Sequence, residues 1–397
     1  MGASGGSISE RSGATFRWHP AARLFDGAGR EYGAVAAAPG LIAERPSGLA
    51  VAQAIAAGSF RIGGAGEAPV GGFETLTSGS SGKPRRIRRR PESWLASFAV
   101  NEGFFGIGPG VNLAVLGRMT QSLALYGALE GMHLGAQVHL LDDLRPDRQR
   151  RVLAKRGVEV VYLTPAQARM LVEAGGVSGG ELPLLRQVLI GGSKLDATLR
   201  AALVAMAPGA QIHEFYGAAE ASFITLAGPG SPDASVGAAY PGVEIEVDVS
   251  GEIWVRSPYL FEAYAGEDPG GARWRGGFLS IGEMGELRQG QLYLSGRAGR
   301  MVTVADQNVF PEEIELFLLG CHGVRQAAVL PVVDNLRGVH LVAVLQGNPG
   351  QEAAILRALR DRLGTLKAPR RVIWRQVWPV MPSGKTDLAA LAEVAKG

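Results

Sequence analysis

The sequence predicts an α/β protein: a large N-terminal domain of α/β layers with a β-rich subdomain, followed by a small C-terminal α+β domain on a hinge. Three observations lead to this prediction. Short apolar runs alternate with segments of helical period in the middle of the chain, runs of alternating polarity without helices follow, and a third pattern starts after Gly296. The first pattern is typical of parallel sheets and the second of antiparallel ones.

The middle of the chain has the clearest rhythm. The predicted strands cover 111–116, 138–141, 158–163, 184–190 and 211–216, and the predicted helices cover 121–131, 147–156, 165–174 and 195–206. Alternation of this kind indicates βαβ crossovers and a mostly parallel sheet. Before residue 70 the periodicity is too weak to place strands.

The part of the chain from residue 243 onward contains two further units. Alternating runs at 243–249, 252–256 and 291–294 predict the β-rich subdomain. Beyond them we expect a helix from Pro311, strands at 327–333 and 339–345, a helix over 352–363 and a strand over 371–377. The glycines of 295–300 suit a hinge, so we predict an N-terminal domain over 1–296 and a mobile C-terminal domain over 297–397.

The composition and the spacing of residues argue against several classes of protein. The 397 residues are 46% apolar and 19% charged, with a net charge of only +3, as in ordinary globular proteins. A single cysteine, Cys321, excludes an internal disulfide, and six scattered histidines give no zinc-site spacing. The N-terminal segment does not have the pattern of a signal peptide, and no apolar run is long enough to span a membrane. We therefore expect a cytoplasmic protein.

A loop rich in glycine and hydroxyl residues follows residue 76. Its members are Thr77, Ser78, Gly79, Ser80, Ser81 and Gly82, with Lys83, Pro84 and Arg85 directly after them. Backbone N–H groups of such a loop can approach phosphate oxygens, hydroxyls can donate or bind Mg²⁺, and the cations balance charge. A flexible loop is the alternative reading. The basic residues Arg88 to Arg90 could extend the phosphate site or form a solvated surface, and the sequence favours neither.

The segment Thr77 to Pro84 resembles the phosphate loop of the acyl-CoA synthetase or adenylate-forming (AMP-binding) superfamily, T-S-G-[ST]-T-G-x-P-K-G, with Arg85 in place of the lysine. Further motifs in the same order extend the resemblance over about residues 70 to 397. It implies that the chain activates a carboxylic acid with ATP and Mg²⁺. Fewer residues precede the loop than is usual in that family, so we expect a shortened first subdomain.

The resemblance assigns the nucleotide and metal contacts. His213 to Glu220 resemble Y-G-x-T-E, in which the aromatic residue, here Tyr216, stacks on adenine and the glutamate, here Glu220, binds Mg²⁺ together with Thr77. The other residues expected at the nucleotide are Gly192, Ser193, Lys194, Glu214, Phe215 and Gly217. Glu283 replaces the aspartate that binds the ribose hydroxyls, and Arg297 of the hinge motif is the second contact.

The motifs of the C-terminal part imply the catalytic lysine and the second half-reaction. Lys385, in a segment similar to P-x-T-x-x-G-K, is expected to hold the carboxylate and the charge that develops on the α-phosphate. With Glu220 and Thr77 it forms the expected catalytic set. Asp306 stands where the family has a glycine that leaves room for pantetheine, so we expect thioester formation to be slow relative to adenylation.

The acid is expected to lie between the segment at 118–122 and the segment at 217–221. The predicted contacts are Met119, Gln121, Ser122, His213 and Ala218. Their apolar and small character permits aliphatic or aromatic acids, and the sequence does not name one.

The sequence thus predicts an AMP-forming acid–thiol ligase that binds ATP, Mg²⁺ and, as second substrate, coenzyme A. The alternatives are a ligase that loads a carrier protein and a degenerate relative that binds nucleotide without forming a thioester. Nucleic-acid binding is disfavoured because no aromatic residues are interleaved with the basic run from Lys83 to Arg90. The oligomeric state stays open, with a homodimer among the options.

Overall fold

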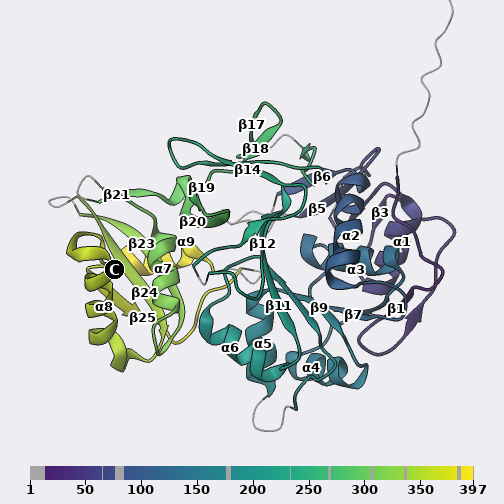
Figure 1. Cartoon of the computed structure of the whole chain (residues 1–397), viewed down its shortest axis with the longest axis horizontal. Helices are drawn as coiled ribbons and strands as arrows, with labels where there is room; N and C mark the ends of the chain where they lie inside the picture. The colour runs from purple at the N-terminus through teal and green to yellow at the C-terminus, as the bar shows by residue number, and fades with distance from the viewer. Residues whose placement is uncertain are drawn as a thin grey trace, which may run out of the picture.

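The chain folds into two lobes of unequal size, seen side by side in Figure 1, with the C-terminal lobe carrying the yellow-green end of the colour range. This computed structural model describes residues 14–64, 66–76, 85–175, 180–232, 234–266, 270–304, 307–334, 338–381 and 386–396. No helix within these ranges is long and apolar enough to cross a membrane. The predicted fold class, a large N-terminal domain of sheets and helices with a small C-terminal domain, is confirmed.

The larger lobe is built on a sheet that has 11 strands within the described residues. In spatial order they are β19 (Glu283–Arg288), β20 (Gln291–Arg297), β13 (Ala238–Ala239), β12 (Ser222–Ala227), β11 (Gln211–Ala218), β10 (Gln187–Gly191), β9 (Val160–Leu163), β7 (Asn112–Val115), β8 (Gln137–Leu140), β1 (Arg23–Phe25) and β2 (Glu31–Tyr32). Neighbours from β11 to β1 are parallel. The predicted parallel sheet is therefore confirmed, with antiparallel strands added at both ends.

Helices cover both faces of this sheet. They are α4 (Pro146–Lys155), α5 (Pro165–Gly175) and α6 (Ala197–Met206) on one face, and α2 (Pro91–Phe105) and α3 (Ser122–Leu134) on the other. Successive side chains of a strand point to opposite faces. Accordingly Leu113 and Val115 of β7 lie in the core under α2 and α3, whereas Ala114 lies in the core under α4 to α6. Two buried faces explain why strands such as β7 and β9 are largely apolar.

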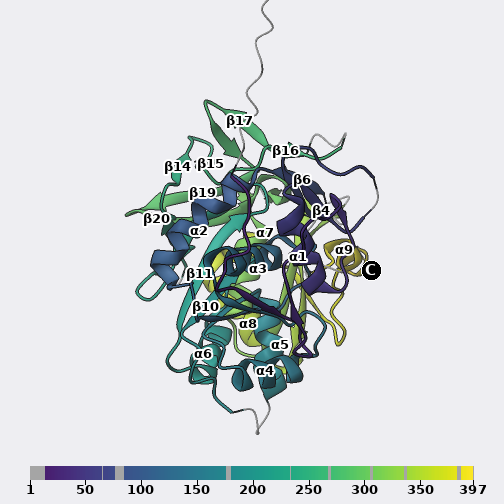
Figure 2. The ribbon, with the colours of Figure 1, turned by 90° about the vertical axis from the view of Figure 1, so that its right-hand side faces the viewer.

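A second sheet contains two of the strands before residue 70, where periodicity was too weak to place strands, together with three later ones. Its strands, in order, are β16 (Ala263–Tyr264), β6 (Arg86–Arg89), β5 (Phe73–Leu76), β4 (Phe60–Ile62) and β3 (Leu41–Ile42), and α1 (Ser47–Ala57) packs beside it, as the turned view of Figure 2 shows. Phe60 and Phe73 stack with ring centroids 5.4 Å apart. Together with Trp94, whose ring centroid lies 4.6 Å from that of Phe73, they join this sheet to the central core.

The remaining strands form the β-rich and C-terminal units predicted from residue 243 onward, except that the predicted run 291–294 belongs to β20 of the 11-stranded sheet. The β-rich part contains β14 (Glu244–Val247), β15 (Ile253–Arg256), β18 (Phe278–Ser280) and β17 (Arg273–Arg275). The C-terminal lobe contains β21 (Val302–Val304), β22 (Gln307–Val309), α7 (Pro311–Leu319), β23 (Val324–Asp334), β24 (Gly338–Gly347), α8 (Glu352–Lys367), β25 (Arg371–Trp374) and α9 (Leu388–Lys396). Apolar clusters lie on both faces of its main sheet, one under α7 and α8 and the other under α9.

Two arginines mark the passage between the lobes. Arg297, the last residue of β20, pairs with Glu283 of the larger lobe at 2.8 Å. Three residues later, Arg300 pairs with Glu315 of α7 at 2.7 Å and lies 3.4 Å from Glu312. A short 3₁₀ turn, η1 (Ala298–Arg300), separates the two ion pairs. Each lobe therefore holds the chain firmly up to this turn. The predicted boundary at residues 296 and 297 and the predicted mobility stay proposals.

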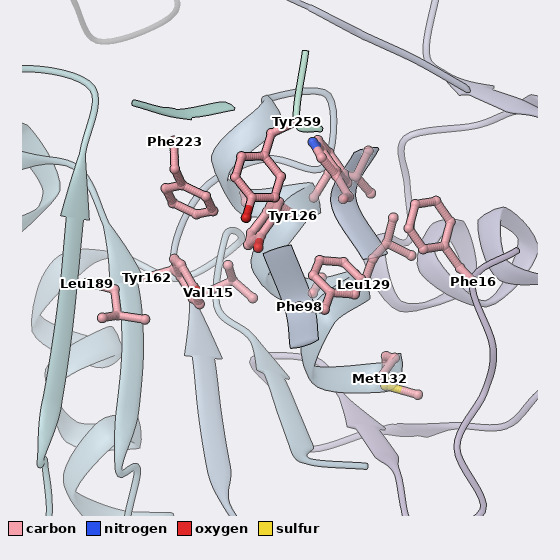
Figure 3. Close-up of a cluster of buried hydrophobic side chains, with 14 of the residues drawn as sticks. Phe16, Phe98, Val115, Tyr126, Leu129, Met132, Tyr162, Leu189, Phe223 and Tyr259 are labelled. Carbon is pink, nitrogen blue, oxygen red and sulfur yellow. The ribbon is translucent and has the colours of Figure 1, made fainter. Parts of the chain in front are cut away.

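A polar network lies inside the aromatic core shown in Figure 3, where Tyr126 and Tyr162 are labelled. Its centre is Glu130 of α3, which is fully buried. Tyr162 donates a hydrogen bond to Glu130 Oε2 at 2.5 Å, and Asn101 and Tyr126 donate to Oε1 at 2.7 and 3.2 Å. Tyr240 donates to Asn101 Oδ1 at 2.6 Å. Burial raises the pKa of Glu130 from 4.5 to about 7, although the three hydrogen bonds oppose the shift.

This shift predicts a pH-dependent stability. Because the pKa of Glu130 is raised in the folded state, its favourable contribution is complete below pH 4.5 and is lost as the pH rises through about 7. The contribution of Glu130 to the free energy of unfolding that is lost over this pH range amounts to roughly 3 kcal/mol. We expect the free energy of unfolding to fall less between pH 5 and pH 8 in Glu130→Gln than in the wild type. Denaturant titrations at both pH values measure it, with Glu102→Gln on the exposed side of α2 as control. Parallel pH profiles for all three proteins would contradict the prediction.

Candidate active site

The end of β11 forms one wall of the candidate site. Tyr216, Gly217 and Ala218 follow each other there, and Glu220 lies in the turn to β12. A bulge interrupts the pairing between Tyr216 and Gly217. A Cβ atom on Gly217 would lie 1.8 Å from the carbonyl oxygen of Ser222, so only glycine allows the two strands to approach this closely. This close approach explains why the sequence motif has a glycine at position 217.

A tyrosine holds the carboxylate of Glu220. Tyr264 of β16 donates a hydrogen bond to Glu220 Oε1 at 3.0 Å. Burial, and after it the charge of Glu220, raises the pKa of the Tyr264 hydroxyl, so this group remains a donor at neutral pH. The guanidinium of Arg85, directly after the phosphate-loop motif, lies 5.8 Å from the centre of the Tyr264 ring. Glu220 and Arg85, both predicted from the sequence, are therefore brought together by a tyrosine that the sequence analysis missed.

Arg89 fixes the backbone beside Glu220. Its side chain is almost fully buried and donates to the carbonyl oxygen of Ala219 at 2.5 Å and to that of Tyr259 at 2.7 Å. Neither sequence hypothesis for Arg88 to Arg90, a phosphate site or a solvated surface, describes Arg89. The alternation of β6 could have indicated this, because Ile87 and Arg89 share its buried face. Arg90, by contrast, is exposed and pairs with Glu262 at 2.5 Å.

Glu283 and Arg297 face each other across the adjacent strands β19 and β20. Their ion pair is 2.8 Å long, and Glu283 is buried. Burial alone would lower the pKa of Arg297, but the charge and the hydrogen bond of Glu283 outweigh it and raise the pKa, with smaller contributions from Tyr216 and Glu220. The structure thus gathers two pairs from separate parts of the sequence, Tyr216 with Glu220 and Glu283 with Arg297, into one electrostatic cluster.

The Tyr216 hydroxyl belongs to this cluster. It is buried and has no hydrogen-bond partner within the described part of the chain. Burial, and after it the charge of Glu283, raises the pKa of this hydroxyl well above its ordinary value. A buried hydroxyl without a partner is costly in a folded protein. A polar ligand that reached this hydroxyl would remove that cost.

The turn after β10 lies beside β11, because the two strands pair in parallel. A Cβ atom on Gly191 would lie 2.1 Å from the ring of Phe215, and Gly192 has a φ of +105°, which favours glycine. Phe215 is buried and packs in the aromatic core against Phe223. Ser193 is exposed at the tip of the turn. The backbone here is available to a ligand, whereas Phe215 supports the site from below.

Glu214 and Lys194 stabilise this turn. Glu214 is buried, accepts a hydrogen bond from the Leu195 backbone at 3.0 Å and pairs with Arg200 at 3.1 Å. Lys194 Nζ donates to the carbonyl oxygen of Ser235 and lies 3.7 Å from Glu214 Oε2. These contacts engage both side chains within the protein, so their predicted contact with the nucleotide stays a prediction.

The residues predicted to contact the acid are only partly brought together. Ser122, the first residue of α3, donates to Thr75 Oγ1 at 2.9 Å and to the Leu76 carbonyl at 3.3 Å. Gln121 forms a β-bridge with Leu76. Both therefore tie α3 to the strand that leads into the phosphate-loop motif. Met119 is completely buried in the core.

His213 does not join the other predicted acid contacts. It lies five residues before Ala218 on the same strand, roughly 16 Å away at the rise of a β-strand. Its ring hydrogen-bonds to Gln187 at 2.9 Å and packs against Phe105. Burial lowers its pKa, so the ring is neutral at pH 7. The motif placed His213 near the site in sequence, but the extended conformation of β11 carries it away.

Several predicted residues lie outside the described ranges. They are Thr77, Ser78, Gly79, Ser80, Ser81, Gly82, Asp306 and Lys385. The flanking strands are described: β5 ends at Leu76 and β6 begins at Arg86. Within the described residues, no group of three or more His, Cys, Asp or Glu could hold a metal. A single carboxylate such as Glu220 fits Mg²⁺, which commonly takes one or two carboxylates and completes its shell with phosphates and water.

Two family models and several known proteins match this chain. Residues 75–265 match the model of the AMP-binding enzyme, and residues 313–385 match the AMP-binding enzyme C-terminal domain. An uncharacterized acyl–CoA ligase of Bacillus subtilis (strain 168) is 31% identical over 326 residues, which are 78% of this chain and 66% of the relative. A 3-hydroxybenzoate–CoA ligase of Aromatoleum sp. (strain CIB) is 27% identical over 348 residues, 82% of this chain and 66% of the relative. The chain thus spans slightly less than two thirds of these relatives.

Solved structures share the fold. The amide bond synthetase McbA from Marinactinospora thermotolerans superposes with a TM-score of 0.73 at 24% identity, over 90% of this chain and 80% of that one. The o-succinylbenzoate CoA synthetase from Bacillus subtilis, in complex with its acyl-adenylate intermediate, gives 0.71 at 21% identity, over 82% and 69%. The two family models together match more than half of the residues, in the expected order. The chain therefore belongs to the family of AMP-binding enzymes.

Proposed function

We propose that this protein activates a carboxylic acid with ATP, forming an acyl-adenylate and pyrophosphate, and then transfers the acyl group to the thiol of coenzyme A. The observation that carries the proposal is the cluster of Tyr216, Glu220, Glu283 and Arg297 beside the strands that flank the phosphate-loop motif. The cluster pairs a metal-binding carboxylate with a second carboxylate suited to ribose hydroxyls.

In the first step an oxygen of the substrate carboxylate attacks the α-phosphorus of ATP. The new bond from oxygen to phosphorus forms as the bond from the α-phosphorus to the bridging oxygen breaks, and pyrophosphate leaves with the electron pair. Two anions must be aligned and the spreading negative charge must be stabilised. We assign this work to Arg85, to the backbone donors of residues 77–82 and to Lys385. No side-chain nucleophile is needed.

Glu220 would hold Mg²⁺, which neutralises phosphate charge when it is bound. The hydrogen bond from Tyr264 to Oε1 orients the carboxylate, and Arg89 fixes the backbone beside it through Ala219. Glu283 would accept hydrogen bonds from the ribose hydroxyls, while Arg297 holds Glu283 in place. The ring of Tyr216 would lie against adenine, on the side where the turn at Gly192 offers its backbone.

The second step is attack of a thiol on the carbonyl carbon of the acyl-adenylate, with AMP as leaving group. Relatives named as CoA ligases support coenzyme A as the acceptor. A carrier-protein pantetheine has the same thiol chemistry and is the alternative acceptor. Asp306 adds bulk and charge where the family has glycine, so we propose that this step is slower than the first.

The proposal is tested by acid-dependent exchange of labelled pyrophosphate into ATP, over a panel of aliphatic and aromatic acids. Hydroxylamine added to the same reactions traps the acyl-adenylate as a hydroxamate. We expect at least one acid to stimulate both exchange and trapping, and coenzyme A to accelerate AMP release with that acid. Saturable binding of ATP without exchange for any acid would instead support the degenerate, nucleotide-binding alternative.

Glu283→Ala should weaken ATP binding. The substitution removes the hydrogen bonds that the ribose hydroxyls donate to a charged acceptor, worth about 1.5–3 kcal/mol each, and removes the ion pair between Arg297 and Glu283. We expect the KM for ATP to rise at least about tenfold. Steady-state kinetics at saturating acid measure the change, with Glu286→Gln, an exposed residue of the same strand, as control. An unchanged KM would show that Glu283 does not contact the nucleotide.

A further inference from the structure

The second sheet, which contains β4, β5 and β6, has a cavity of about 640 Å³ on its outer face. The proposed reaction does not use this cavity. Arg61, Arg86 and Arg88 line it together with Glu74, and the segment at 67–70 and residues 265–266 form its walls. Three guanidinium groups line the cavity with two carboxylates, those of Glu74 and Glu67, so an excess of one positive charge remains. A cavity of this composition needs an explanation beyond packing.

The register of the sheet explains why these side chains meet. Arg61 of β4 pairs with Glu74 of β5, which in turn pairs with Arg88 of β6, so the three side chains form one row across the outer face. Their neighbours Phe73 and Ile87 point to the opposite face and lie in the core. The row is therefore a fixed feature of the strands.

Glu74 is shared between two arginines at the limit of hydrogen-bond distance. Its Oε2 lies 3.4 Å from Arg61 Nη1, and its Oε1 lies 3.4 Å from Arg88 Nη2. Arg86 donates instead to the Gly63 carbonyl at 3.0 Å. Burial, and after it the positive charge of Arg61, lowers the pKa of Arg86. Glu74 and Glu67 together thus offset two of the three guanidinium charges.

Several buried guanidinium nitrogens of the arginines that line this cavity have no partner within the described residues. They are Nε and Nη2 of Arg61, Nη1 of Arg86 and Nε of Arg88. Arg61 is only 7% exposed, so bulk water cannot satisfy it freely. Buried N–H donors without acceptors are rare, because leaving them unpaired is costly. An anion with several acceptor oxygens would satisfy these donors and offset the excess positive charge.

We propose that this cavity binds a small phosphate anion, inorganic phosphate or pyrophosphate, through Arg61, Arg86 and Arg88. A phosphate group offers several acceptor oxygens to guanidinium forks, which match its geometry. The site is distinct from the candidate active site, because its arginines lie on the outer face of the sheet, whereas Arg89 on the inner face reaches the Glu220 turn. It does not depend on the proposed function, since anion binding is measured without an acid substrate.

Isothermal titration of the full-length protein with sodium phosphate, and separately with pyrophosphate, tests the proposal. A non-hydrolysable ATP analogue and Mg²⁺ are kept in excess so that anions do not report on the nucleotide site. We expect saturable binding of at least one anion. Tighter binding of pyrophosphate would point to the released product as the natural ligand, and tighter binding of phosphate to the free anion of the medium. No saturable binding of either anion at millimolar concentration would overturn the proposal.

Variants distinguish a binding site from a merely structural cluster. Arg88→Gln, whose side chain is 42% exposed and least at risk of misfolding, should weaken binding at least about tenfold. Glu74→Gln should tighten binding, because it removes the competing negative charge. Arg90→Gln is the matched control, since this neighbour is 67% exposed and pairs with Glu262 outside the cavity. Equal affinity in Arg88→Gln and wild type, or unchanged or weaker binding in Glu74→Gln, would contradict the assignment.

Discussion

Replacing Glu220 with glutamine should lower acid-dependent pyrophosphate exchange at least about a hundredfold. The amide has nearly the same size as the carboxylate and can still accept the hydrogen bond from Tyr264. It loses the negative charge that makes an oxygen a good ligand for Mg²⁺. The defect should therefore lie in metal use and not in folding.

Exchange rates measured over a range of Mg²⁺ concentrations separate these two possibilities. We expect Glu220→Gln to need far more Mg²⁺ than the wild type, or to remain slow at every concentration, while its melting temperature stays close to that of the wild type. Glu262→Gln is the control, since Glu262 belongs to an exposed ion pair with Arg90. A variant with wild-type exchange at wild-type Mg²⁺ would remove Glu220 from the metal site.

The second large effect is expected for Lys385→Ala. We predict a loss of adenylate formation of about a hundredfold or more, with ATP binding largely preserved, because the charge of Lys385 acts on the transition state more than on the ground state. Exchange kinetics and direct nucleotide titration measure the two quantities separately. Lys396→Ala is a suitable control, because Lys396 lies in the same C-terminal part and forms only an exposed pair with Glu393. Unchanged exchange would mean that adenylation uses another cation.

The sequence predicted the central sheet well because its strands are buried on both faces. The strands β7, β9 and β10 are short, largely apolar runs, and each strand from β7 to β11 is followed by a helix or a turn. The strands before residue 70 have only two or three residues each, too few to show a period. They form because distant segments pair with them, as β1 does with β8, and a single sequence does not display such pairing.

The residues of the candidate site likewise divide into those that the sequence could predict and those that it could not. Glu220 and Arg85 could be predicted because each belongs to a compact motif. Tyr264 and Arg89 could not, because their importance comes from contacts across the chain: Tyr264 lies 44 residues from the carboxylate it holds, and Arg89 lies 130 residues from Ala219. Within the basic run, charge alone could not distinguish an arginine that faces the core from one that faces solvent.

The ion pairs of Arg297 and Arg300 have a mechanical consequence. Any reorientation of the C-terminal lobe that keeps both pairs must be made by the backbone bonds between these two residues, with two soft dihedral angles for each intervening residue. The connection is then a short hinge of a few rotatable backbone bonds and differs from a long flexible linker. A small change in a backbone dihedral angle at Ala298 or Gly299 would move residues near this hinge only slightly. The same change would displace α9, near the end of the chain, by a much larger distance. Stiffening these two residues should therefore affect the most distant parts of the lobe most strongly.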